Sequence, residues 1–311
     1  MDVATNGLKP RLLVIAGPTA VGKTVISISV AKALDGEVIS ADSAAVYRGL
    51  NVGAAKIRPQ DTQGVPHHGL DWADPATPFS VADFQLRAGR VIEDILTRGR
   101  LPIIVGGTGL WIRALIRHYH LPEQASPGPL RAHLDAMGQQ YGFESLRRQL
   151  RVVDPQSYQA IDRHDHRRLV RALEVFMTSG QVLPRNTSDS PYHATYWVLT
   201  RTVSDLHERI RRRTQAMLDQ GLVTEVKALL AAGVPKTAQS FTAIGYKETI
   251  DWLWGRLTDE ERNRLIIRHT QQLAKRQLTW FRAEKDARWI DLSAWPVDAA
   301  IEKIVQSMRD H

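Results

Sequence analysis

The sequence predicts an α/β fold in which buried parallel strands alternate with helices. Short runs typical of buried strands recur along the chain, as Leu12–Ala16, Glu37–Ala41 and Leu101–Val105. Helical patterns follow the first and the second of these runs, as in Val25–Leu34 and Val81–Thr97. A glycine-rich loop separates the first strand from the first helix. Strands that alternate with helices in this way form a central parallel sheet.

The loop between the first strand and the first helix matches the whole pattern G-x-x-x-x-G-K-[ST]. Its glycines let backbone N–H groups turn inward around phosphate oxygens, and the helix that follows adds its positive N-terminal end. Lys23 supplies a mobile charge and the Thr24 hydroxyl can ligate Mg²⁺. We therefore predict a P-loop NTPase-like core that binds a di- or triphosphate. The diphosphate-binding residues are Gly17, Pro18, Thr19, Ala20, Val21, Gly22, Lys23 and Thr24.

Polar residues follow two further strands of the predicted sheet. Asp42 and Ser43 come after the second strand, and Thr108 lies among the glycines of Gly106–Gly109 after the third. Ligands of open parallel sheets bind at this carboxyl edge. Asp42 either caps a turn or takes a metal-linked or catalytic role, and its nearness to the phosphate loop favours the second. Thr108 is equally well interpreted as a ligand contact or as a helix N-cap.

The alternation of strands and helices breaks at Pro122–Pro129, and helical patterns then continue to about Gly180. We predict a helical insertion at residues 121–192, between a first core part at 8–120 and a second at 193–311. The second core part is expected to contain the strand Thr195–Thr200, the helices Val203–Gln220, Gly245–Trp254 and Asp259–Glu284, the strand Arg288–Leu292 and the helix Pro296–Arg309.

One histidine pair lies in a segment that we predict to be a loop. Residues 58–78 are rich in Pro, Asp and Gly, which favours a loop. The pair, His67 and His68, is interpreted as hydrogen-bonding surface groups and is left out of the site.

Arg213 interrupts the apolar stripe of its helix. Leu206, Ile210 and Met217 occupy the rest of that stripe. An arginine aimed at a core or a cleft is costly unless an anion meets it. That anion is either a protein carboxylate or a bound phosphate, and we favour the phosphate.

The charge of the chain suggests a polyanionic partner. The net charge is +8. Basic residues cluster on one face of a helix in the insertion and, with a tryptophan, on the helix Asp259–Glu284. Such faces are either solvated or suited to a folded RNA. Their members are Arg167, Arg168 and Arg171 in the insertion, and Arg264, Arg268, Gln271, Lys275, Arg276, Trp280 and Arg282 in the later helix.

The absence of cysteine excludes several classes of protein. A disulfide framework, a thiol nucleophile and a Cys-based zinc module are all ruled out. No apolar run has the length of a membrane span, and the N-terminus does not have the pattern of a signal peptide. We expect a cytoplasmic protein with no membrane partner.

Several long blocks occur in the order found in one family. Together they resemble the tRNA dimethylallyltransferases, which are adenosine isopentenyltransferases acting on tRNA, from about Leu12 to Asp291. Since the chain lacks cysteine, it resembles the bacterial form and not eukaryotic relatives that add a zinc finger. The blocks include GPTAVGKT, ADSAAVYRGLNVGAAK, LPIIVGGTGLWI, RRLVRALEV, RIRRRTQAML, AIGYKE and QLAKRQLTWFR.

This resemblance implies transfer of a dimethylallyl group from its diphosphate to the N6 amine of the tRNA adenosine 3′ of the anticodon. It implies Mg²⁺ as cofactor, with Thr24 as a ligand, and we expect a monomer. The implied catalytic residues are Asp42 as base, Thr108 as orienting group, and Lys23 and Arg213, which also bind the diphosphate. The implied tRNA-binding residues are Asp42, Ser43, Ala44, Ala45, Thr108, Arg167, Arg168, Arg171, Gly245, Tyr246, Lys247, Lys275, Arg276 and Arg282.

Three other functions compete with this one. An adenylate isopentenyltransferase would use a free nucleotide, but the helical insertion and the late basic helix argue against so small a substrate. A small-molecule P-loop kinase would need an adenine pocket and an arginine lid, which the sequence does not indicate. A non-catalytic RNA-binding module would leave the phosphate loop unexplained.

Overall fold

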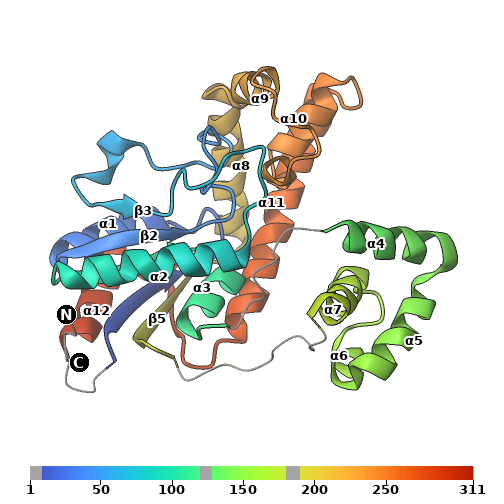
Figure 1. The fold of residues 1–311 in the computed structure, drawn as a ribbon. Coiled ribbons are helices and arrows are strands. Elements are labelled where there is room, and N and C mark those ends of the chain that lie inside the picture. Colours follow the sequence, from blue (N-terminus) through green and yellow to red (C-terminus); the bar gives the residue numbers. More distant parts are fainter. Residues whose placement is uncertain (1–8, 120–127, 180–189, 311) are drawn as a thin grey trace. The chain divides into compact units, whose positions relative to one another are not determined.

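The computed structural model describes residues 9–119, 128–179 and 190–310, and in it six strands form one parallel sheet (Figure 1). The strand order is β3-β2-β4-β1-β5-β6, and every neighbouring pair is parallel. The strands are β1 (Arg11–Ala16), β2 (Gly36–Ala41), β3 (His67–His68), β4 (Leu101–Gly106), β5 (His193–Thr200) and β6 (Arg288–Asp291). The predicted α/β fold with a central parallel sheet is confirmed.

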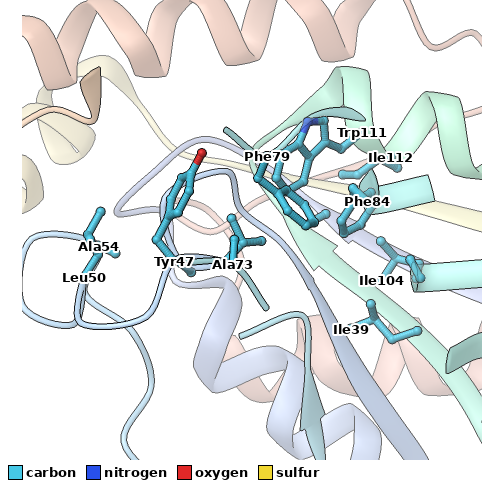
Figure 2. Close-up of a cluster of buried hydrophobic side chains, with 14 of the residues drawn as sticks. Ile39, Tyr47, Leu50, Ala54, Ala73, Phe79, Phe84, Ile104, Trp111 and Ile112 are labelled. Carbon is cyan, nitrogen blue, oxygen red and sulfur yellow. The ribbon is translucent and has the colours of Figure 1, made fainter. Parts of the chain in front are cut away.

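Helices cover both faces of the sheet because the strand residues alternate between two apolar clusters. Leu13 of β1 packs in one cluster with α1 (Lys23–Ala33) and α12 (Val297–Arg309). Leu12 packs in the other with α2 (Val81–Thr97), α3 (Gly109–Ile116) and α11 (Asp259–Arg282). Figure 2 shows part of this second cluster, in which the Phe84 and Trp111 rings stack with centroids 4.6 Å apart.

The strand register brings three loops to one edge of the sheet. Ala16 at the end of β1 and Ala41 at the end of β2 both pair with Gly106 at the end of β4. The phosphate loop, the segment at Asp42 and the segment at Thr108 therefore begin side by side.

The remaining helices of the part of the chain that contains the sheet lie between β5 and β6 in the sequence. The helices α8 and α11 pack together through Leu206, Ile210 and Ala274. The elements are α8 (Val203–Asp219), α9 (Leu222–Ala231), the 3₁₀ turn η2 (Gln239–Thr242) and α10 (Tyr246–Leu253), with a further 3₁₀ turn, η1 (Pro59–Thr62), before β3.

Residues 118–189 form a separate compact unit with its own apolar core. The predicted insertion, 121–192, differs from this unit by three residues at each end. Leu146, Leu150, Leu169 and Leu173 are buried in its core. Its helices are α4 (Pro129–Tyr141), α5 (Phe143–Val153), α6 (Pro155–Ala160) and α7 (His166–Ser179).

One predicted loop contains a strand. The segment 58–78 includes β3, whose two histidines pair with Val38 and Ile39 of β2. Two residues are too few for a strand pattern to be visible in the sequence. In the described part of the chain, no helix is long and apolar enough to cross a membrane.

Candidate functional site

The phosphate loop has the backbone that its glycines predict. Gly17 has φ of 152° and Gly22 has φ of 112°, a region that L-residues rarely adopt. A Cβ on Gly17 would lie 2.6 Å from the Leu199 carbonyl oxygen. The loop ends where α1 begins, so the helix N-terminus is directed at the space beside the loop.

Lys23 lies against the loop that precedes it. Its Nζ donates to the carbonyl oxygens of Gly17 and Pro18, both at 2.9 Å. Burial lowers the pKa of Lys23 to about 8; the charge of Asp42 opposes this shift, and that of Arg213 adds to it. A bound polyanion would reverse the shift, because it stabilises the ammonium form.

A cavity of about 430 Å³ opens beside the loop. Among the described residues that line it, Asp42 is the only one with a carboxylate, while several have cationic side chains. This charge balance suits a diphosphate. The cations are Lys23, Lys56, Arg209, Arg212 and Arg213, and the loop contributes Thr19, Ala20, Gly22 and Thr24.

Arg213 forms no ion pair with any carboxylate of the described residues. The predicted stripe is confirmed, with Leu206, Ile210 and Met217 buried. The Arg213 guanidinium donates to the Ala54 carbonyl oxygen at 3.4 Å, and within the described ranges no carboxylate lies in ion-pair distance of it. Burial lowers its pKa, against the effect of Asp42. The interpretation as a buried Arg–carboxylate pair is therefore wrong, and an external anion remains.

Two further arginines fix the phosphate loop and were not predicted from the sequence. Arg209 Nε donates to the Ala20 carbonyl oxygen at 2.7 Å, and Arg201 Nε donates to that of Val21 at 2.9 Å. Burial and the charge of Arg201 lower the pKa of Arg209, against Asp205. The spacing of Arg209 and Arg213, one helical turn apart, is the sequence signal that could have identified Arg209.

A second cavity of about 360 Å³ adjoins the first. The loops after β2 and β4 contribute Asp42, Ser43 and Thr108 to its wall, and α11 contributes Thr270 and Arg276. Residues that line both cavities mark the place where they meet. These shared residues are Thr19, Asp42, Ala54, Gly107, Arg213 and Gln277.

The two carboxylate oxygens of Asp42 have different surroundings. Its Oδ1 accepts the N–H groups of Ala44 at 2.9 Å and Ala45 at 3.3 Å, so the turn-cap interpretation holds for this oxygen. No described residue donates to Oδ2. Thr108 occupies the N-cap position of α3 but makes no capping bond, and its Oγ1 accepts the Ser43 N–H at 3.3 Å. The N-cap role predicted as one alternative for this hydroxyl is therefore wrong.

Gln277 of α11 joins two of the loops. Its Oε1 accepts the Thr19 N–H at 2.9 Å, and its Nε2 donates to the Gly107 carbonyl oxygen at 3.0 Å. A Cβ on Gly107 would overlap this amide, so only glycine allows the approach. The sequence placed Gln277 in a basic helix and gave no signal of this role.

Glu225 of α9 organises the segment that carries Ala54. Its carboxylate accepts the N–H groups of Asn51, Val52 and Gly53 at 2.7 to 3.1 Å. The Tyr246 hydroxyl donates to it at 2.6 Å, and burial raises the pKa of that tyrosine. Because Tyr246 is fully buried, its predicted contact with tRNA is wrong. Gly245 is also buried, and its N–H donates to Glu248, so its predicted tRNA contact is wrong as well.

The other residues predicted to bind tRNA differ in exposure. Arg171 pairs with Glu174, which Arg131 also contacts, so its predicted role as a free phosphate contact is wrong. Trp280 packs on Gly109, with Arg113 4.5 Å from its ring centroid, and supports α3. Exposed side chains are those of Ser43, Arg167, Arg168, Lys247, Lys275, Arg276 and Arg282; Ala44 is half-buried and Ala45 is buried beside the first cavity.

The two histidines have different surroundings. His67 lines the first cavity, and its Nδ1 lies 2.8 Å from the Val65 carbonyl oxygen. Burial lowers its pKa, so the ring is neutral at pH 7 and Nδ1 is the donor. His68 lies 2.7 Å from Glu37 and outside the cavity.

The site fits a magnesium ion only together with a ligand. In the described residues, no group of three or more His, Cys, Asp or Glu side chains could hold a metal. The Thr24 hydroxyl is exposed at the first cavity. Mg²⁺ is commonly held by one protein oxygen together with phosphate oxygens and waters.

Comparisons with known proteins identify the family of the chain. The family model described as IPP transferase matches residues 45–284, and the one described as Isopentenyl transferase matches residues 10–71. The tRNA dimethylallyltransferase 1 of Trichlorobacter lovleyi is 44% identical, over 94% of this chain and 96% of its own.

Solved structures show the same likeness. The full-length tRNA isopentenylpyrophosphate transferase of Bacillus halodurans is 42% identical with a TM-score of 0.74, over 97% of this chain and 96% of that one. A eukaryotic dimethylallyltransferase described as acting on tRNA is 26% identical with a TM-score of 0.81, over 97% of this chain and 79% of that one. The chain belongs to the tRNA dimethylallyltransferase family of prenyl-transferring enzymes.

Proposed function

We propose that this enzyme transfers a dimethylallyl group from dimethylallyl diphosphate to the N6 amine of the tRNA adenosine immediately 3′ of the anticodon. The product is N6-isopentenyladenosine. The observation that supports this reaction is the pair of adjoining cavities, which share Asp42 and Arg213. The first cavity suits a diphosphate, and Asp42, the only carboxylate among the described residues that line both cavities, has one oxygen that no described residue donates to.

The diphosphate is the leaving group of the reaction. As the allylic C–O bond breaks, negative charge grows on the departing oxygen. Lys23 and Arg213 line the cavity and stabilise that charge more strongly than they stabilise the ground state. Thr24 would hold Mg²⁺ beside the phosphate oxygens, and the ion when bound neutralises part of the same charge.

The adenine amine is a poor nucleophile because its lone pair is delocalised into the ring. As its nitrogen bonds to the allylic carbon, the amine loses a proton, and we assign Asp42 Oδ2 as the acceptor because Asp42 lines the cavity and only its Oδ1 is hydrogen-bonded in the described residues. The Thr108 oxygen already accepts the Ser43 N–H, so its own proton is left to donate. One C–O bond breaks, one N–C bond forms, and diphosphate is released.

The acceptor adenine must leave its stack to reach a cavity. Exposed cations on α11, Lys275, Arg276 and Arg282, lie on the helix that also supplies Gln277. We propose that they hold the backbone of the anticodon loop, and that Arg167 and Arg168 of α7 add phosphate contacts. We propose a cytoplasmic location for the reaction, because its acceptor is a tRNA.

The test is incubation of the enzyme and Mg²⁺ with labelled dimethylallyl diphosphate and tRNA, beside AMP and ATP as acceptors. We expect label on tRNA alone and its loss when the acceptor adenosine is replaced by guanosine. Label on free nucleotide, or turnover of ATP with small acceptors, would contradict the proposal.

A further inference from the structure

Tyr47 has a buried hydroxyl group with no hydrogen-bond partner. The residue is 2% exposed, and no residue in the described ranges hydrogen-bonds its Oη. Nearly all buried polar groups in folded proteins are paired with protein, water or ligand. A bound ligand could therefore supply the hydrogen bond that this buried hydroxyl lacks.

The position of Tyr47 points to the second cavity. Tyr47 is one of the residues that line that cavity, together with Asp42 and Thr108. Figure 2 shows its oxygen directed away from Leu50 and Ala73. The cavity wall thus includes a residue whose hydroxyl has no hydrogen-bond partner among the residues that the structure describes.

The backbone of Tyr47 is held in place. It forms a β-bridge with Ala73, and its carbonyl oxygen accepts the Lys56 ammonium at 2.9 Å. Burial raises the pKa of Tyr47, against an opposing effect of the Phe79 backbone, which makes no hydrogen bond of ordinary geometry to the phenol. The hydroxyl therefore keeps its proton and can donate a hydrogen bond.

We propose that Tyr47 donates a hydrogen bond to a ring nitrogen of the acceptor adenine and so helps to select this base. The inference rests on the proposed function. Adenine presents its amine, a donor, next to the ring nitrogens N1 and N7, which are acceptors. Asp42 accepts from the amine and Tyr47 donates to its neighbour, whereas guanine would set its carbonyl oxygen against the Asp42 carboxylate.

A second orphaned tyrosine provides a matched control. Tyr196 is also buried, at 9% exposure, with an unpaired hydroxyl, but it lines neither cavity. Both Tyr47→Phe and Tyr196→Phe remove an unsatisfied oxygen and nothing else. If the Tyr47 hydroxyl were only a tolerated defect, the two variants would behave alike.

The test compares kcat/KM for an anticodon stem-loop RNA between wild type, Tyr47→Phe and Tyr196→Phe. We expect a loss of about tenfold for Tyr47→Phe, with the KM for dimethylallyl diphosphate within about twofold and no fall in Tm. Tyr196→Phe should match wild type. Wild-type kcat/KM in Tyr47→Phe would overturn the assignment, whereas no transfer by wild type would instead refute the proposed function.

Modified RNAs identify the contact itself. Stem-loops carrying 1-deaza- or 7-deazaadenosine at the acceptor position lack one ring nitrogen each. With one of these RNAs, kcat/KM of the wild type should fall about tenfold. The same RNA should not lower kcat/KM of Tyr47→Phe further, since that variant already lacks the donor. If neither RNA is slower with wild type, or if both losses multiply with the Tyr47→Phe loss, the hydrogen bond does not exist.

Discussion

One carboxylate oxygen of Asp42 accepts backbone N–H groups and the other is free in the described part of the chain, so a substitution can test the role of the free oxygen as a base. Asp42→Asn preserves an oxygen for the Ala44 and Ala45 N–H groups but cannot accept a proton. Turnover should fall by roughly 10² to 10⁴ while tRNA affinity changes little. Single-turnover assays and filter binding measure the two quantities. Asp61→Asn, which alters an exposed carboxylate paired with Arg58, is the control; equal turnover in both variants would end the assignment of Asp42 as base.

The lowered pKa of Lys23, about 8, predicts how donor use depends on pH. Below pH 8 the free enzyme carries the ammonium that the diphosphate needs. Above pH 8 the Lys23 amine is neutral, so it must take up a proton when the diphosphate binds. In that range kcat/KM for dimethylallyl diphosphate should fall about tenfold per pH unit. A profile from pH 6 to 10 measures this. Lys23→Arg, which stays charged, should lose the alkaline fall, and a profile that keeps it would exclude Lys23 as its origin.

Arg213 is an unpaired, partly buried cation, so its removal should affect chemistry and not folding. Arg213→Ala should unfold at the wild-type temperature or above, because the ligand-free enzyme loses an uncompensated charge. Turnover should drop by roughly 10² to 10³, since the charge that it meets grows as the C–O bond breaks.

The control for Arg213 is an arginine that has a partner. Arg113→Ala removes a cation 2.5 Å from the buried Glu284 carboxylate, which keeps Arg117 at 3.3 Å, and should cost about 1.5 to 3 kcal/mol of stability. Thermal unfolding of both ligand-free variants decides the matter. A large loss of stability in Arg213→Ala with normal chemistry would make Arg213 structural.

At the scale of elements, the sequence predicted what local patterns determine. The strands β1, β2 and β4 are short apolar runs, and the loop between β1 and α1 has glycines that its φ angles require. Parallel pairing then brings Asp42 and Thr108 together without further information. The strand β3 was missed because two histidines form no pattern and are held there by pairing with β2.

The errors involve partners that are distant in the sequence. Tyr246 opens a helix and was predicted to bind tRNA, but its hydroxyl donates to Glu225, 21 residues earlier. Arg171 could have been paired with Glu174 by spacing, whereas the Arg131 contact with that carboxylate could not. Gln277 bonds Thr19 across 258 residues. Such contacts arise from tertiary packing, which periodicity does not encode.

The link that α11 makes through Gln277 yields a prediction for that element. Gln277→Leu removes both hydrogen bonds that tie the phosphate loop to Gly107 and leaves the helix intact. We expect kcat to fall roughly tenfold, since two neutral hydrogen bonds no longer hold the loops in register, and the free energy of unfolding to fall by about 1 to 3 kcal/mol. Gln272→Leu, an exposed glutamine on the same helix, is the control. Equal kcat in the two variants would show that the link is dispensable.

At the scale of the molecule, the two cavities and some of the residues predicted to bind tRNA belong to different units. The described residues that line both cavities all belong to 1–117 and 190–311, whereas α7 lies in the unit 118–189, which has a core of its own. Changes on the exposed face of α7 therefore leave the cavity walls untouched. Donor chemistry and tRNA affinity should be separable by substitutions in one unit.

The double variant Arg167→Ala with Arg168→Ala tests this separation through salt dependence. Each lost phosphate contact makes the plot of log affinity against log salt concentration shallower by about 0.7 to 0.9, so two contacts should change its slope by about 1.5. The KM for dimethylallyl diphosphate should stay at the wild-type value. Arg148 and Arg151, exposed on α5 of the same unit, supply the matched pair for replacement by alanine. If both doubles shift the slope equally, the unit attracts tRNA only through its overall charge; if neither does, α7 makes no phosphate contact.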